Sequence, residues 1–132
     1  IAAAVASIGA AIAIRLVPSL TSAITGVHFI TTLTLFAMGG ALAARLGAAG
    51  WRAGMFAGLL DALVGHPIAF LLSSPPDASQ VTLPQGTDAT PELLATLHVW
   101  GAVLGAAAAV VIALVAGAMG GWYARRTLVA RS

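Results

Sequence analysis

Four ionisable side chains lie within stretches of sequence that are otherwise apolar: Arg15, His28, Asp61 and His66. An ionisable group is costly to place in hydrocarbon, so such residues are candidates for a functional role. Arg15 could neutralise Asp61 in a structural ion pair, hold an anionic group, or extend its side chain to the outer membrane interface. Together with His66, these two residues would suit a small transporter or channel.

The two histidines are expected at similar depths on neighbouring antiparallel helices. Counting helical rise from the arginines at one end of each helix places His28 at ~25 Å and His66 at ~21 Å, with Asp61 at ~13 Å. The two rings could form hydrogen bonds between helices. They could instead be the axial ligands of a haem b in a haem- or quinone-linked electron-transfer protein. Pro67 would kink the helix next to His66 and free backbone carbonyls there.

The sequence offers no recognisable enzyme chemistry. It contains no HExxH motif, no paired carboxylates and no phosphate-binding glycine loop. It contains no cysteine, which excludes disulfides and thiolate nucleophiles. We therefore expect a protein that is not an enzyme, in which any cofactor remains unknown and haem b is one candidate.

The composition indicates that lipid surrounds these residues. The chain has 132 residues, of which 60% are hydrophobic and 8% charged, whereas a soluble domain carries roughly 25% charged residues. Its net charge is +2 and its basic residues form no stripe, so nucleic-acid binding is not expected. The sequence predicts one all-α transmembrane domain over residues 1–132.

Four stretches approach the 20 or so apolar residues that cross a bilayer. They cover about residues 1–17, 22–46, 51–72 and 91–126. A short link containing Gly47 and Gly50 makes the second and third helices antiparallel neighbours. The polar segment 73–90 reads as an outer aqueous loop, and Thr90 followed by Pro91 reads as a helix start. We expect His98, at ~40 Å by the same count, to lie at the interface or contact the loop.

The tetrapeptide Ala-Met-Gly-Gly occurs twice, at residues 37–40 and 118–121. Each copy precedes an arginine near the end of an even-numbered helix. This repeat allows the interpretation that the bundle consists of two duplicated hairpins, as in some transporter folds.

The placement of arginine predicts the orientation of the bundle. Five of the six arginines would lie on one side if four helices alternate: Arg45, Arg52, Arg125, Arg126 and Arg131. The 73–90 loop on the other side contains acids and no base. The positive-inside rule then places both termini in the cytoplasm, with the inner (plasma) membrane of a bacterium as the expected location.

Small residues form two stripes at helical spacing. The third helix carries Gly54, Gly58 and Gly65 on one face, and the fourth carries Gly101, Gly105, Gly117 and Gly120. Such faces let helices approach closely in lipid. They could pack within the chain, or against other membrane subunits or a second copy. The favoured interpretation is an accessory or structural subunit of a larger respiratory, photosynthetic or transport complex. The electron-transfer and transporter interpretations remain open.

Overall fold

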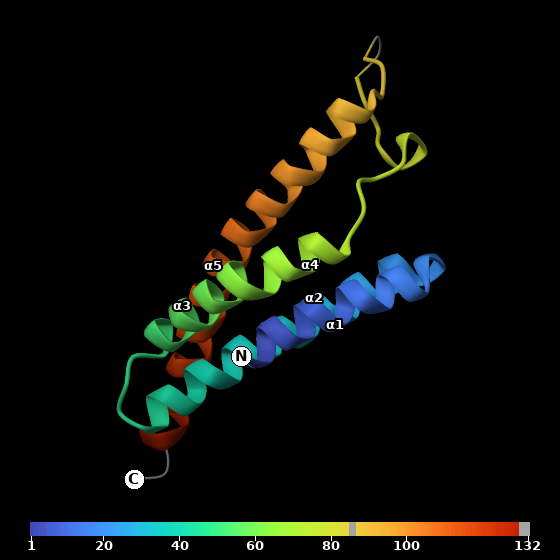
Figure 1. Cartoon of the computed structure of the whole chain (residues 1–132). Coiled ribbons are helices and arrows are strands. Elements are labelled where there is room, and N and C mark those ends of the chain that lie inside the picture. The colour runs from blue at the N-terminus through green and yellow to red at the C-terminus, as the bar shows by residue number, and fades with distance from the viewer. Residues whose placement is uncertain (85–86, 130–132) are drawn as a thin grey trace.

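The computed structural model describes residues 1–84 and 87–129, and the regular structure in this part of the chain is entirely helical (Figure 1). The elements in chain order are α1 (Ala2–Leu16), η1 (Pro18–Leu20), α2 (Thr21–Arg45), α3 (Gly50–Leu60), η2 (Asp61–Gly65), α4 (His66–Leu72), η3 (Ala78–Gln80) and α5 (Pro91–Val129). The π-helical segment η2 joins α3 to α4 without a break, so these three elements form one rod. The prediction of an all-α bundle is confirmed.

Three of the helical rods are long and apolar enough to cross a membrane: Pro18–Arg45, Gly50–Leu72 and Pro91–Thr127. The first helix, Ala2–Leu16, is apolar but shorter. Four membrane-spanning helices were expected, and three of them are long and apolar enough to span a membrane. The 39 residues of α5 extend for ~58 Å, which is nearly twice the hydrocarbon thickness of a bilayer.

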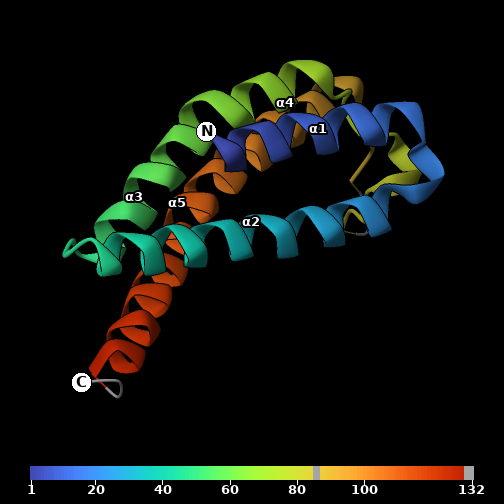
Figure 2. The ribbon, with the colours of Figure 1, turned by 90° about the horizontal axis from the view of Figure 1, so that it is seen from below.

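The turn between α2 and α3 is fixed by Gly47, whose φ of 80° is in the left-handed region that favours glycine. The Ala48 N–H donates to the carbonyl of Ala43 at 2.8 Å, and the Gly47 N–H donates to that of Ala44 at 3.1 Å. This pair of bonds is the Schellman motif, which closes a helix and reverses the chain. Figures 1 and 2 show the resulting antiparallel course of α2 and α3.

The start of α5 follows the expected capping chemistry. The helix begins at Pro91, and the Leu93 N–H donates a hydrogen bond of 3.2 Å to Oγ1 of Thr90. Proline at the first position loses no hydrogen bond, because the first N–H groups of a helix have no partner within it. The predicted helix start is confirmed.

The backbones of α2, α3 and α5 meet at a glycine seam. The seam consists of Gly40, Gly50, Gly54, Gly58, Ala113, Gly117, Gly120 and Gly121. A Cβ on Gly117 would lie 2.7 Å from Cα of Gly54, closer than real Cβ contacts allow. A Cβ on Gly40 would collide with the carbonyl of Gly117. Glycine is therefore required for this approach, and the few large buried side chains beside it include Phe36, which is 2% exposed.

Four arginines lie at the seam end of the molecule. Arg45 ends α2, Arg52 lies in the first turn of α3, and Arg125 donates from Nη2 to the carbonyl of Ala48 in the link between them, at 3.3 Å. Arg126 lies over the ring of Trp122 at 4.0 Å. The fifth predicted member, Arg131, lies outside the described residues.

Away from the seam, the helices diverge (Figure 2). Two open grooves lie between them. The α1–α2 groove has a volume of about 390 Å³, and the α4–α5 groove about 350 Å³. Helix α1 packs against both α2 and the η2–α4 part of the long rod. Residues of α1, α2 and the η2–α4 segment therefore lie near one another where α1 meets η2.

Candidate proton-transfer site

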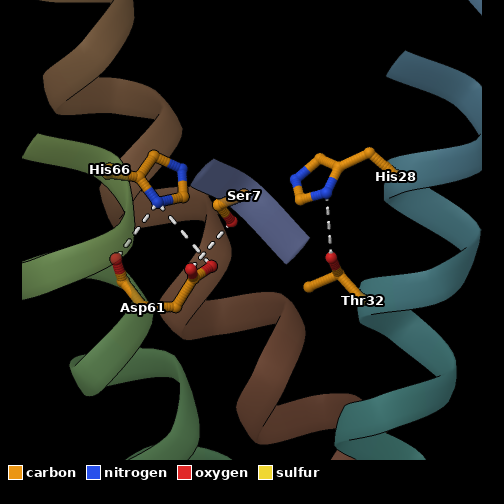
Figure 3. Close-up of polar contacts among 5 residues, drawn as sticks. All are labelled: Ser7, His28, Thr32, Asp61 and His66. Atoms are coloured by element: carbon orange, nitrogen blue, oxygen red, sulfur yellow. Dashed lines mark hydrogen bonds and ion pairs between the residues drawn. The ribbon is translucent and has the colours of Figure 1, made fainter. Parts of the chain in front are cut away.

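Asp61 is the central residue of the candidate site. It begins η2 and is 1% exposed, although it is a carboxylate on an apolar helix. Ser7 of α1, itself buried, donates a hydrogen bond of 2.8 Å from Oγ to Oδ1 of Asp61 (Figure 3). The site is thus assembled from two helices that are far apart in the sequence.

The second carboxylate oxygen of Asp61 lacks a hydrogen bond. Oδ2 is buried and has no such partner among the described residues. The nearest ionisable group is Nδ1 of His66, at 3.7 Å. A bare carboxylate oxygen in an apolar interior is costly, and that cost falls when the carboxyl binds a proton or the neighbouring imidazole carries one. The arrangement is therefore suited to holding a proton between Asp61 and His66.

The π-helical turn explains why these two residues meet. Residues five apart in an α-helix point about 140° away from each other. In η2 the His66 N–H instead bonds to the carbonyl of Asp61, five residues earlier, so the wider turn places both on one side. His66 Nδ1 lies 3.4 Å from the same carbonyl. Pro67 has no N–H to donate, and its ring crowds the preceding turn, which favours the wider turn. Such π segments are frequent at functional sites.

Gly65 permits the contact between α1 and η2. A Cβ at this position would lie 3.0 Å from Cα of Ala4 and would collide with Oδ1 of Asp61. Without a side chain at Gly65, the backbone of α1 comes close enough for Ser7 to reach the carboxylate. The predicted packing residue Gly65 therefore lies in the site itself.

His28 faces this cluster from α2. Its Nδ1 lies 3.4 Å from Oγ1 of Thr32, a buried side chain one helical turn along. Figure 3 shows the imidazole pointing toward Ser7 and Asp61 from the side opposite His66. The structure thus brings together three of the four ionisable residues that the sequence singled out.

Arg15 is the residue that the structure does not bring to the site. Its Nη1 donates to the carbonyl of Leu72 at 3.3 Å, on the exposed C-terminal end of α4. Of the alternatives for Arg15, the ion pair with Asp61 is therefore not formed, and the side chain extends instead to the exposed end of α4. A cation is favourable next to the unpaired carbonyls that end a helix, and this exposed position keeps the guanidinium away from the apolar interior.

His98 also lies apart from the cluster. Its Nε2 lies 3.2 Å from Oγ of Ser73, and its ring stacks on Phe70 with centroids 4.6 Å apart. The prediction that His98 contacts the long loop is confirmed, because Ser73 is the first residue of that loop.

The two histidines open into different grooves. His28 lines the α1–α2 groove, and His66 lines the α4–α5 groove. Axial ligation of one haem would require a single cavity lined by both rings. The two rings therefore do not line one shared cavity in which a single haem would lie between them.

The predicted small-residue stripes are largely occupied within the chain. Gly54, Gly58, Gly117 and Gly120 lie in the glycine seam. Gly105 lies against the ring of His66, whose Cδ2 would be 3.7 Å from a Cβ. Gly101 differs, since a Cβ there would meet no described atom within 4 Å.

The sequence did not indicate that Ser7 and Thr32 belong to the site, nor that Gly40, Gly50 and Gly121 pack in the seam. The Ala-Met-Gly-Gly repeat contained a usable signal, because a Cβ on Gly120 would collide with the backbone of Ala37, so the two copies lie at the same crossing. No comparable signal marked Ser7, which is one small polar residue in an alanine-rich helix.

Comparison with known proteins adds no family to these observations. No protein-family model, curated protein or solved structure matches the chain.

Proposed function

We propose that this chain is a membrane protein that conducts protons through the Asp61–His66 pair. The observation that carries the proposal is Oδ2 of Asp61, a buried carboxylate oxygen without a hydrogen bond among the described residues and 3.7 Å from an imidazole nitrogen. Intramembrane carboxylates and histidines commonly form proton relays.

A proton is favoured over other small ligands by the donor set. Imidazole nitrogens bind protons readily, whereas the hard cations sodium, magnesium and calcium prefer several oxygen ligands. Asp61 already accepts from Ser7 at Oδ1, so one carboxylate oxygen remains free. One free oxygen next to a nitrogen base provides too few ligands for such a cation. The same pair of atoms is sufficient to bind a proton.

The membrane orientation is part of the same proposal. Arg45, Arg52 and Arg125 lie together at the seam end, and this clustering supports a cytoplasmic location for that end under the positive-inside rule. The loop between α4 and α5 would then lie outside, in the inner membrane of a bacterium.

The test is proton flux in liposomes of phosphatidylcholine and phosphatidylglycerol that contain the purified chain and an internal pH dye. A potassium gradient with valinomycin drives the flux, and the initial rate of the pH change is measured. Asp61→Asn keeps the side-chain shape but cannot exchange a proton. We expect it to lower the rate by about a hundredfold, the lower end of what one positioned proton-transfer group contributes.

Asp88→Asn in the exposed loop is the matched control, because it removes the same charge far from the site. It should conduct as the unaltered chain does. Size-exclusion chromatography and circular dichroism verify that both variants fold. Equal rates in Asp61→Asn and Asp88→Asn, at equal protein content, would refute the proposal.

The interpretation as a subunit of a larger complex stays a prediction. It depended on two small-residue stripes needing a partner, and most of those residues pack within the chain. Co-purification in mild detergent remains its direct test.

A further inference from the structure

We infer that His28 is a second proton relay, so that Asp61 passes protons between the α4–α5 groove and the α1–α2 groove. This inference rests on the proposed function and extends it by a route. It starts from an asymmetry of the site: each histidine lines a different groove, and the buried carboxyl group of Asp61 lies between the two rings (Figure 3).

The ring of His66 has one nitrogen on each side of the proposed route. Nδ1 is directed at Asp61, 3.7 Å from Oδ2. Nε2 is directed away, toward α5, and lies 3.8 Å from the position of a Cβ on Gly105. The absence of a side chain at Gly105 leaves Nε2 uncovered at the α4–α5 groove. A proton can therefore arrive at one nitrogen and leave from the other.

The ring of His28 has the opposite arrangement. Its Nδ1 lies beside Thr32, and the second nitrogen points toward Asp61 and Ser7 (Figure 3). His28 and Thr31 supply the polar atoms of the α1–α2 groove, which is otherwise lined by apolar residues. The two histidines are thus placed on either side of one carboxyl group.

Each step of the proposed route moves one proton from a donor atom to an acceptor atom. Nε2 of His66 takes a proton from the groove, and the imidazolium releases the proton on Nδ1 to Oδ2 of Asp61. The neutral carboxyl then gives its O–H proton to Nε2 of His28, which becomes an imidazolium, and Asp61 is again a carboxylate. His28 releases a proton from Nδ1 toward Thr32 and the α1–α2 groove. Ser7 keeps its hydrogen bond to Oδ1 throughout.

The groups that face Asp61 from each packed element are few. Among the described residues, helix α1 supplies Ser7, α2 supplies His28 and α4 supplies His66, and α5 places the uncharged Gly105 against the ring of His66. The guanidinium group of Arg15 does not face Asp61, because it bonds to the carbonyl of Leu72. The route therefore depends on two imidazoles and one carboxyl.

The first experiment is chemical rescue in the liposome assay. His28→Ala removes the relay, and we expect a proton flux about a hundredfold lower. Added imidazole should restore the flux, because the groove at His28 has about 390 Å³ and can admit the free base. A merely structural histidine would not be replaced by a diffusing base. His98→Ala is the control, since that ring contacts the loop and not Asp61.

A second pair of variants tests the other groove. Gly105→Leu places a side chain over Nε2 of His66, whereas Gly101→Leu adds the same side chain one turn away, where no described atom lies within 4 Å of a Cβ. We expect Gly105→Leu to lower the flux by about tenfold or more, a modest part of what a positioned proton-transfer group supplies, and Gly101→Leu to leave it unchanged.

The outcomes separate the inference from the function on which it rests. If Asp61→Asn conducts normally, the proposed function fails. If Asp61→Asn is inactive but His28→Ala conducts like His98→Ala, the site stands and the second relay is refuted. A His28→Ala flux that is low and stays low with imidazole also refutes the relay. Should His28→Ala not fold, His28→Gln repeats the comparison with a side chain that keeps a polar amide.

Discussion

The hydroxyl of Ser7 and Oδ1 of Asp61 lie 2.8 Å apart, although 54 residues of sequence separate them. This bond joins α1 to the π-helical turn of the long rod, and both residues are buried. It supplies one of the few polar contacts between helices in an otherwise apolar bundle. Hydrocarbon offers no competing donor, so Oδ1 of Asp61 depends on the Ser7 hydroxyl for its hydrogen bond.

Ser7→Ala should therefore destabilise the fold. Removing the donor leaves a second buried oxygen of Asp61 unpaired, at a cost of about 1–3 kcal/mol in the free energy of unfolding. Unfolding in mixed micelles of a mild detergent and dodecyl sulfate, followed by circular dichroism, measures the loss. Ser22→Ala, at the exposed start of α2, is the control and should change little. Equal stability of the two variants would contradict the importance of the Ser7 bond.

Pro67→Ala should convert the π-helical turn toward an α-helix. The new N–H can donate to the carbonyl of Leu63, which we expect to raise stability by about 1 kcal/mol. The same change rotates Asp61 and His66 apart, so the proton flux should fall by about tenfold even though the protein is more stable, because a misplaced group loses its catalytic contribution. Pro75→Ala in the loop is the control. A stable Pro67→Ala protein with full flux would show that the π turn is unnecessary.

Gly117→Ala tests the glycine seam. Its Cβ would lie 2.7 Å from Cα of Gly54 and 2.8 Å from the carbonyl of Gly50, and backbone atoms cannot yield as a flexible side chain can. We expect a loss of about 1–3 kcal/mol from this overpacking. Gly101→Ala makes the same chemical change at a position with free space and should be neutral or slightly stabilising. Indistinguishable unfolding curves would mean that the helices do not approach this closely.

Phe36→Ala tests the apolar core beside the seam. Phe36 is 2% exposed, so its removal should leave a cavity and cost about 3 kcal/mol. Phe56→Ala is the matched control, because that ring is 67% exposed and lipid or detergent already surrounds it. A similar loss in both variants would place Phe36 outside the core.

Much of the fold could be predicted because local chemistry determines it. Gly47 closes α2 through a left-handed residue, and Thr90 with Pro91 starts α5, as their residue types predict. The apolar runs predict the helices, since hydrocarbon requires every backbone group to be satisfied within the segment. These features depend on neighbours in sequence, which is why they were accessible without a structure.

The candidate site was accessible only in part. Asp61, His28 and His66 stand out because their residue types are rare in apolar helices. Their partners do not stand out, since whether Ser7 or Arg15 reaches Asp61 depends on how α1 is placed against η2. The π turn shifts the register by one residue after Asp61, and no counting of α-helical positions can anticipate that shift.

The possible duplication of two hairpins stays a prediction. The two Ala-Met-Gly-Gly copies meet at one crossing, which explains their residue types by packing alone. A packing requirement at Ala37 and Gly120 would produce the same similarity without any common origin.

The position of the glycine seam along α5 has a mechanical consequence. The seam holds this rigid 39-residue rod at residues 113–121, near its C-terminal third, and the α4–α5 groove lies on the longer arm. A stiff lever that is held at one pivot must move its two ends in opposite directions. A small displacement of the short arm beyond Gly121 would therefore become a larger displacement of the long arm and would widen or narrow the space beside His66.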